Sequence, residues 1–213
     1  MVVSINPFDA KAATWDDAVK VDRAEAVARK IRATVVLDGS MRMLEYGAGT
    51  GLVTQALRDS VGPVTLADSS PGMREVMRAK IAAGALTDAR VLDLDLATQP
   101  VPAEHFDLIV SVLTLHHIEH IDVVLSAFAK LLDERGTLCV VDLDEEDGSF
   151  HGDDFEGHRG FARATLASEL TTAGFIDVVF QDCHHIVRDG VNYPLFLATA
   201  RAARSDEGPQ VQP

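Results

Sequence analysis

The sequence predicts an α/β fold, in which a mostly parallel β-sheet is covered by helices on both faces. Short apolar runs alternate with segments of helical periodicity along the first two thirds of the chain, as expected of repeated strand–helix–strand units. The first run leads into three closely spaced glycines, as at a tight turn between a strand and a helix. The 213 residues fit one domain better than two, and we expect that domain to span residues 1–204.

Five apolar runs are expected to form the parallel part of the sheet. They are residues 41–46, 64–67, 89–94, 106–113 and 137–143. The fourth, FDLIVSVL, is almost continuously apolar, which is typical of a strand covered on both faces. Residues 51–59, 72–83 and 121–132 have the spacing of helices, and Gly136 is expected to end the last of them.

The two ends of the chain depart from this alternation. Residues 163–173 are expected to form a helix, and no helix separates the strand-like runs 176–181 and 195–200. These two strands must therefore be antiparallel at one edge of the sheet. An amphipathic helical stretch at residues 15–36, ahead of the first strand, makes residues 1–38 a lid segment that packs over the sheet or the ligand site. The polar, proline-containing residues 205–213 are predicted to be a disordered tail.

Composition narrows the class of partner. The chain has 33 acidic residues against 19 lysines and arginines, a formal net charge of −14 that repels phosphate backbones and anionic lipid. We therefore expect a small-molecule partner, with no nucleic acid and no membrane; nothing in the sequence decides the oligomeric state. No apolar run reaches the roughly 18 residues of a membrane span. Two isolated cysteines, Cys139 and Cys183, favour free thiols in the cytoplasm.

The glycine loop after the first strand carries the strongest functional signal. Its glycines allow the backbone to approach a ligand without a clash from a Cβ atom. A nicotinamide-binding loop is the first alternative, but the third glycine comes one position early, and Leu52 stands where that fingerprint requires a small residue. Glu45 would also repel a pyrophosphate and attract a cationic amine. The residues expected to contact the ligand are Glu45, Gly47, Ala48, Gly49 and Gly51.

A carboxylate follows the second strand. Asp68 is placed to accept hydrogen bonds from both hydroxyls of a ribose. The alternative, that Asp68 caps the next helix, is weaker because Ser69 and Ser70 are available for capping. We expect Asp68 and Ser69 at the ligand and Met73 beneath a purine, although Met73 could equally be an ordinary core residue.

A second acidic group ends the third strand, in the sequence DLDLA. Asp95 can accept a hydrogen bond from an exocyclic amine, and the backbone N–H of Leu96 can donate to a ring nitrogen. The pair would specify adenine, unless Asp95 is only a solvated loop acid. Three strand ends therefore predict a pocket for an adenine nucleoside with a cationic end.

These elements together resemble those of the class I S-adenosylmethionine-dependent methyltransferases. The resemblance rests on LEYGAGTG at 44–51, LADSSPGM at 66–73 and FDLIVSVLTLHHI at 106–118, and within the class it is greatest to the ubiquinone and menaquinone methyltransferases. It implies a Rossmann-like three-layer sandwich with a seven-stranded, mostly parallel sheet and an antiparallel last strand. It also implies S-adenosyl-L-methionine as cofactor and S-adenosyl-L-homocysteine as product.

The same resemblance implies a role for each site residue. Glu45 and the glycine loop would hold the methionine end of the cofactor, and Asp68 would hold the ribose. Asp95 and Leu96 would bind the adenine. Ser111, near the end of the fourth strand, would lie beside the sulfonium.

Methyl transfer from a sulfonium is an in-line displacement in which the cofactor supplies the electrophile. A general base is needed only if the acceptor must lose a proton. Of the adjacent His116 and His117 at most one should face the pocket, and we favour His116 as the base, with a helix-capping role as the alternative. Phe150 and Phe155 could form apolar walls. Further residues expected at the acceptor pocket are Trp15, His117, Asp144, Glu145 and His151.

Two histidine groups raise the question of a metal. His116, His117 and His120 are close in sequence, as are His184 and His185. Neither group shows a ligand spacing with a supporting third residue on a known element. We therefore expect no functional metal site.

The sequence leaves other functions open beside the transfer of a methyl group to a small-molecule acceptor. A regulatory protein could keep the cofactor pocket without transfer activity, and it would then bind the cofactor but methylate nothing. A nicotinamide-dependent enzyme is a third hypothesis, already weakened by the glycine spacing.

Overall fold

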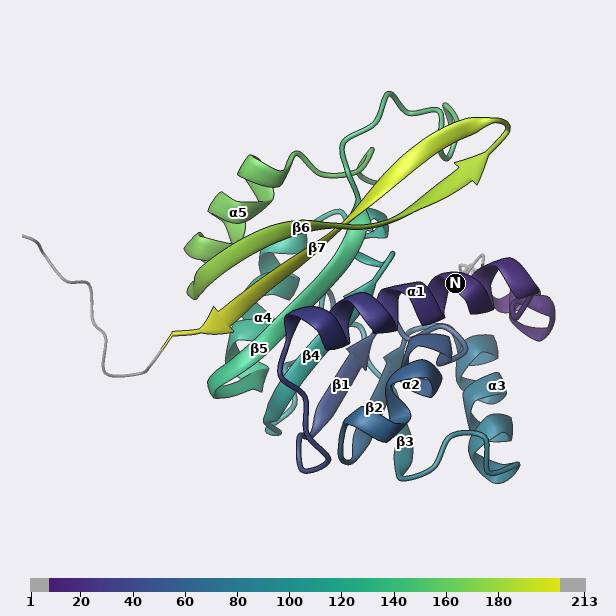
Figure 1. Ribbon diagram of the computed structural model, residues 1–213, viewed down its shortest axis with the longest axis vertical. Helices are drawn as coiled ribbons and strands as arrows, with labels where there is room; N and C mark the ends of the chain where they lie inside the picture. The colour runs from purple at the N-terminus through teal and green to yellow at the C-terminus, as the bar shows by residue number, and fades with distance from the viewer. Residues whose placement is uncertain (1–7, 204–213) are drawn as a thin grey trace, which may run out of the picture.

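A computed structural model of the protein describes residues 8–203, so the predicted tail at 205–213 lies outside the described residues. One sheet holds seven strands in the order β3-β2-β1-β4-β5-β7-β6 (Figure 1). The strands are β1 (Met43–Tyr46), β2 (Val64–Asp68), β3 (Ala89–Asp93), β4 (Phe106–Val112), β5 (Leu132–Leu143), β6 (Phe175–Arg188) and β7 (Val191–Ala202). Strands β1 to β5 are parallel, and β7 is antiparallel to both β5 and β6. The predicted α/β fold with an antiparallel last strand is confirmed.

Helices cover both faces of the sheet (Figure 1). They are α1 (Ala18–Thr34), α2 (Leu52–Leu57), α3 (Pro71–Ala82), α4 (Ile121–Leu131) and α5 (Arg163–Thr172), with the 3-10 helices η1 (Asp9–Thr14), η2 (Arg58–Ser60) and η3 (Leu115–His117). Side chains of α1, α2 and α3 pack in one apolar core, and those of α4 and α5 pack in the other. In β4, Leu108 and Val110 belong to the first core and Ile109 to the second, which explains the continuous apolar run of this strand.

The last two strands extend well beyond the predicted runs. They form a long hairpin whose turn at Asp189 and Gly190 uses positive φ angles. The pairing of β7 with β5 stops at Leu195, so the outer half of the hairpin is a two-stranded ribbon (Figure 1). On β6 that half begins near His184, within the polar stretch QDCHH, which lacks the apolar alternation by which strands are predicted.

The starts of one helix and one strand also differ from the prediction. Helix α1 begins at Ala18, because the side chain of Asp17 caps it by accepting a hydrogen bond from the N–H of Lys20 at 2.9 Å. Trp15 therefore lies ahead of the helix. Strand β5 begins at Leu132, directly after α4, and not beyond Gly136 as expected.

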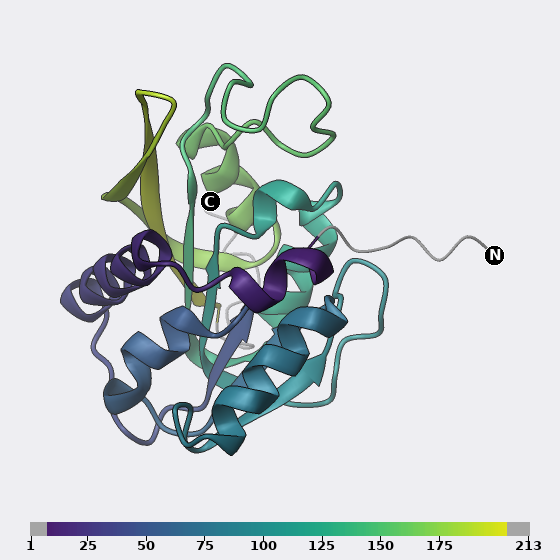
Figure 2. The same ribbon diagram turned by 90° about the vertical axis from the view of Figure 1, so that its right-hand side faces the viewer.

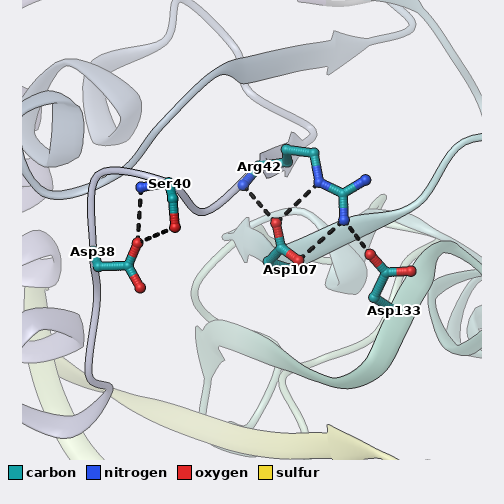
Figure 3. A network of polar contacts seen from close by, with 5 residues as sticks. All are labelled: Asp38, Ser40, Arg42, Asp107 and Asp133. Carbon is teal, nitrogen blue, oxygen red and sulfur yellow. Dashed lines mark hydrogen bonds and ion pairs between the residues drawn. The ribbon is translucent and has the colours of Figure 1, made fainter.

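Ion pairs link three central strands where these strands begin (Figure 3). Arg42, just ahead of β1, donates from its backbone N–H to Asp107 at 2.8 Å and from two guanidinium nitrogens at 3.0 Å each. The same guanidinium also pairs with Asp133 at the start of β5. This edge of the sheet is thus tied together at the surface, on the side opposite to the glycine loop.

Candidate functional site

A cavity of about 950 Å³ opens where the parallel strands end. Its walls are the loops that follow β1, β2, β3 and β4, as expected for ligand sites in open α/β sheets. Residues of η1 and α1 also line it, and Figures 1 and 2 show the purple η1 beside the start of α3. The volume is at the upper end of the roughly 300–1,000 Å³ typical of small-molecule sites.

The loop after β1 is held close to its neighbours. The backbone N–H groups of Gly47 and Ala48 both donate to the carbonyl of Ala67, at 2.9 and 3.0 Å. Gly47 has a φ of +69°, and a Cβ atom there would lie 2.2 Å from the side chain of Thr114. Gly47, Ala48 and Gly49 line the cavity as predicted. Only glycine fits at position 47.

Gly51 has a different role from the predicted one. It does not line the cavity, and its αL conformation begins α2. A Cβ atom at this position would approach Leu86 to 3.1 Å, in the apolar core. Gly51 is therefore needed for helix packing, and its assignment to direct cofactor contact is wrong.

Glu45 is a buried carboxylate at the floor of the cavity. It is 3% exposed and accepts a hydrogen bond from the backbone N–H of Thr54 at 3.0 Å, and another from the Thr54 hydroxyl. Burial raises the pKa of Glu45 to about 7, although the bonds from Thr54 oppose the shift. A cation beside this carboxylate would stabilise its ionised form.

Asp68 faces the cavity from the end of β2. Its two carboxylate oxygens accept the backbone N–H groups of Gly49 and Ser70, each at 2.8 Å. Burial nevertheless raises its pKa. Ser70 caps α3 by accepting from the N–H of Met73 at 3.1 Å, so Asp68 is not the helix cap. Ser69 and Met73 line the cavity beside it.

Only one of the two residues predicted to bind adenine lies at the cavity in the loop after β3. Asp95 lines the cavity and accepts from the Ala97 N–H at 3.0 Å and the Thr98 hydroxyl at 2.9 Å. Leu96 is buried away from the cavity, and its N–H donates to the hydroxyl of Tyr46 at 3.0 Å. Because this donor is already occupied, the expected bond from Leu96 to a ring nitrogen is wrong.

Ser111 does not reach the cavity. It is 1% exposed inside β4, and its hydroxyl has no partner among the described residues. Strand β4 continues to Val112, and the positive φ of Leu113 then turns the chain so that Leu113 and Thr114 line the cavity. The predicted contact of Ser111 with the sulfonium is therefore wrong, and Leu113 and Thr114 occupy that wall.

The chain ahead of β1 also supplies cavity residues, and the sequence predicted Trp15 among them but not Lys20 or Arg23. Trp15 lines the cavity, with its indole nitrogen 3.8 Å from where a Cβ of Gly49 would lie. Lys20 and Arg23 of α1 also line it, and the Lys20 ammonium lies 5.0 Å from the centre of the Trp15 ring. Their one-turn spacing with the buried Ala24 and Val27 was the available sequence signal.

As predicted, only one of the two adjacent histidines faces the cavity, but it is His117 and not His116. His116 is 2% exposed, and its Nδ1 lies 2.6 Å from Oδ1 of Asp142, which is also buried. His117 lines the cavity, while His116 does not. A pocket-facing role for His116 is thus wrong, because its neighbour occupies the wall. Burial, together with His116 and His151, lowers the pKa of His117 to about 3.

The remaining predicted pocket residues do not line the cavity. Asp144 is held by Arg163 through two hydrogen bonds of 2.7 Å, and Glu145 is exposed. His151 lies beside His116, with ring centres 5.1 Å apart, and stacks on Phe155 at 3.9 Å. Asp144 and Glu145 are therefore structural and surface residues, whereas His151 joins the histidines behind the cavity wall.

Comparisons with known proteins agree with the fold. The Methyltransferase domain family matches residues 44–140. A malonyl-[acyl-carrier protein] O-methyltransferase of Halorhodospira halophila is 27% identical over 208 residues, which cover 93% of this chain and 67% of the relative. A ubiquinone/menaquinone biosynthesis C-methyltransferase of Stutzerimonas stutzeri is 25% identical over 148 residues, which cover 66% of this chain and 57% of the relative.

A solved structure shares the fold over nearly the whole chain. It is an S-adenosylmethionine-dependent methyltransferase from Aquifex aeolicus, with a TM-score of 0.69, 18% identity, and coverage of 92% of this chain and 98% of that one. Residues 44–140 thus match a methyltransferase domain, and the chain as a whole has the fold of the S-adenosylmethionine-dependent methyltransferases. Within residues 8–203, no helix is long and apolar enough to cross a lipid bilayer.

Proposed function

We propose that this protein transfers the methyl group of S-adenosyl-L-methionine to a small-molecule acceptor held in the same cavity. The observation that carries the proposal is the lining of the cavity, which combines carboxylates and the glycine loop with His117. In this proposal the carboxylates and the glycine loop form the cofactor end, and His117 marks the acceptor end. The N-terminal helices cover this cavity, which favours a small acceptor over a macromolecule.

At the cofactor end, each group has a chemical complement. The carboxylate of Glu45 attracts the methionine ammonium, and the half-buried cation of Arg23 attracts the methionine carboxylate. Asp68 accepts from the ribose hydroxyls, and Asp95 accepts from the adenine amine. Trp15, together with η1 and α1, acts as a lid that excludes water.

At the acceptor end, the protein aligns the nucleophile with the methyl carbon and the sulfur. Such alignment can supply on the order of 7–11 kcal/mol of the barrier reduction. His117 is the ring in contact with the acceptor, and His116 with Asp142 positions that ring from behind. The two free cysteines favour the cytoplasm as the place of this transfer.

A transfer assay tests the proposal. The protein is incubated with methyl-labelled S-adenosylmethionine and either the dialysable or the retained fraction of a cell extract. We expect label to appear in the dialysable fraction only, and Asp68→Ala to reduce it. Label confined to the retained fraction would place the acceptor on a macromolecule. No label in either fraction, despite cofactor binding, would support the regulatory alternative.

A further inference from the structure

We propose that His116, His117 and His151 form a binding site for a divalent transition-metal ion at the acceptor end of the cavity. One ring nitrogen from each residue lies within 4.8 Å of the other two. The ring centres of His116 and His117 are 4.0 Å apart, and those of His117 and His151 are 5.2 Å apart. The three rings come from η3 and from the loop that follows β5, so the fold and not the sequence spacing brings them together.

His116 has the surroundings of a metal-ligating histidine. Its Nδ1 is bonded to the carboxylate of Asp142, whose other oxygen accepts the backbone N–H of His116 at 3.3 Å. The side chains of this pair are 2% and 1% exposed. A carboxylate on one ring nitrogen fixes the tautomer and the ring orientation, and it leaves Nε2 free for a metal.

His151 contributes an unsatisfied nitrogen. Its Nε2 is buried and has no hydrogen-bond partner among residues 8–203. A buried polar atom without a partner costs about 1–3 kcal/mol, so some ligand or ion is expected to satisfy it. Stacking on Phe155 prevents the ring from turning freely toward solvent. If the three rings served only to pack against one another, nothing would explain why Nε2 of His151 is buried without a hydrogen-bond partner.

The loop that bears His151 is docked onto η3. The N–H of His158 donates to the carbonyl of His116 at 2.8 Å, and the His158 ring contacts the carbonyl of Ile118 at 2.9 Å. Gly157 allows this approach, because a Cβ there would lie 2.3 Å from the His116 carbonyl oxygen. The third ring is therefore held in place beside the other two.

The donor set indicates which ion would bind. Imidazole nitrogens suit zinc, copper, iron and nickel, and three histidines leave a fourth tetrahedral position open. Zinc–nitrogen bonds of about 2.0–2.1 Å would require the rings to move together by roughly 1 Å. Because His117 lines the cavity, an open position would face the acceptor. Metal binding itself does not depend on the proposed methyl transfer, but it would give the acceptor end a Lewis acid.

Cobalt and zinc titrations of the cofactor-free protein test the site. After treatment with a chelator, Co²⁺ is added and the visible absorption of a tetrahedral complex is followed, and Zn²⁺ is then used to displace it. We expect one Co²⁺ per chain. His151→Ala should remove this signal, and Asp142→Asn should weaken Zn²⁺ binding about 10- to 100-fold, as for other carboxylates that orient a ligand.

Matched variants separate this site from adventitious binding. His120→Ala removes an exposed histidine three residues from His117, and the double variant His184→Ala/His185→Ala removes the neighbouring pair on β6. Both should bind Co²⁺ like the unmodified protein. Loss of the signal in the double variant, or no tetrahedral signal in the unmodified protein, would overturn the proposal.

Folding is checked by thermal unfolding of every variant. His117→Gln replaces a cavity-facing ligand and provides a second test if His151→Ala does not fold. Retention of full Co²⁺ affinity by a folded His117→Gln or His151→Ala variant would also overturn the proposal. The metal titrations contain no cofactor or acceptor. A negative titration therefore does not contradict the methyl-transfer proposal, and a negative transfer assay does not contradict the metal site.

Discussion

Charged groups have opposite surroundings at the two edges of the sheet, one where the parallel strands begin and the other where they end. At the edge where the strands begin, Arg42 lowers the pKa of Asp107, and the two side chains are paired through several hydrogen bonds (Figure 3). At the edge where the strands end, burial raises the pKa of both Glu45 and Asp68. Paired charges stabilise the first edge, whereas the second holds carboxylates where ionisation is unfavourable until a ligand arrives. Perturbed pKa values of this kind mark functional sites.

The backbone is also packed differently at the two edges. Where the strands begin, the paired side chains lie at the surface and are about a third to a half exposed. The second edge brings the glycine loop and the turn after β4 into close contact, so that a single methyl group at Gly47 has no room. Substitutions at the two edges should therefore differ in the size of their effect and in the property that they change, either stability or cofactor affinity.

The largest effect is expected from Gly47→Ala. Both Gly47 and Gly49 have positive φ angles, but only a Cβ at Gly47 clashes with Thr114, whereas the nearest atom at Gly49 is 3.8 Å away. Gly47→Ala should lower the free energy of unfolding by about 2–5 kcal/mol, from overpacking and left-handed backbone strain together. Gly49→Ala, the matched control, should lower it by only about 1–2 kcal/mol. Denaturant titrations with equal losses would show that the contact with Thr114 is unimportant.

Asp68→Ala should mainly change cofactor affinity. The loss of hydrogen bonds to a charged group should weaken binding of S-adenosylhomocysteine by about 1.5–3 kcal/mol, or roughly 10- to 150-fold. Calorimetric titration measures this change. Asp107→Asn, at the other edge, is the control and should leave the affinity unchanged. Unchanged affinity in Asp68→Ala would remove the ribose from this position.

Glu45 should make cofactor binding depend on pH. Its carboxyl group has a pKa of about 7 in the free protein. Cofactor affinity should fall as the pH drops below about 7, approaching tenfold per pH unit, because protonation removes the charge that attracts the ammonium. In the free protein the sign is reversed, since the stability contributed by the protonated group is lost as the pH rises from 4.5 toward about 7.

The variant Glu45→Gln should bind the cofactor more weakly at pH 8, with an affinity nearly independent of pH. Calorimetry between pH 6 and 8 measures the affinities of the unmodified protein and of this variant. The same slope in both proteins would assign the pH dependence to another group.

The sequence predicted the central strands well because they are buried on both faces. Leu44, Leu66 and Ile109 are fully buried in short runs rich in apolar residues, and the run around Ile109 is almost continuously apolar. The roles of Leu96 and Ser111 could not be predicted, because they depend on tertiary contacts. Whether the N–H of Leu96 is free depends on the position of the Tyr46 hydroxyl, which is distant in sequence.

The histidines show the same limit more clearly. The sequence predicted that only one of His116 and His117 would face the pocket, since adjacent side chains diverge. Which one does so is decided by Asp142, which holds His116 from the neighbouring strand β5. The approach of His151 depends on a loop that has no regular periodicity, so no local pattern could indicate it.

The smallest effect is expected from Arg42→Ala, at the edge where the strands begin. Its guanidinium is partly exposed, so water screens the pairs with Asp107 and Asp133, and the loss of stability should be about 0.5–1 kcal/mol. The loss should shrink as salt is added, because the Debye length falls from about 10 Å at 0.1 M to about 3 Å at 1 M. Cofactor affinity should not change. Denaturant titration and calorimetry of the same sample test both statements, and a cofactor defect as large as that of Asp68→Ala would mean that the two edges are not independent.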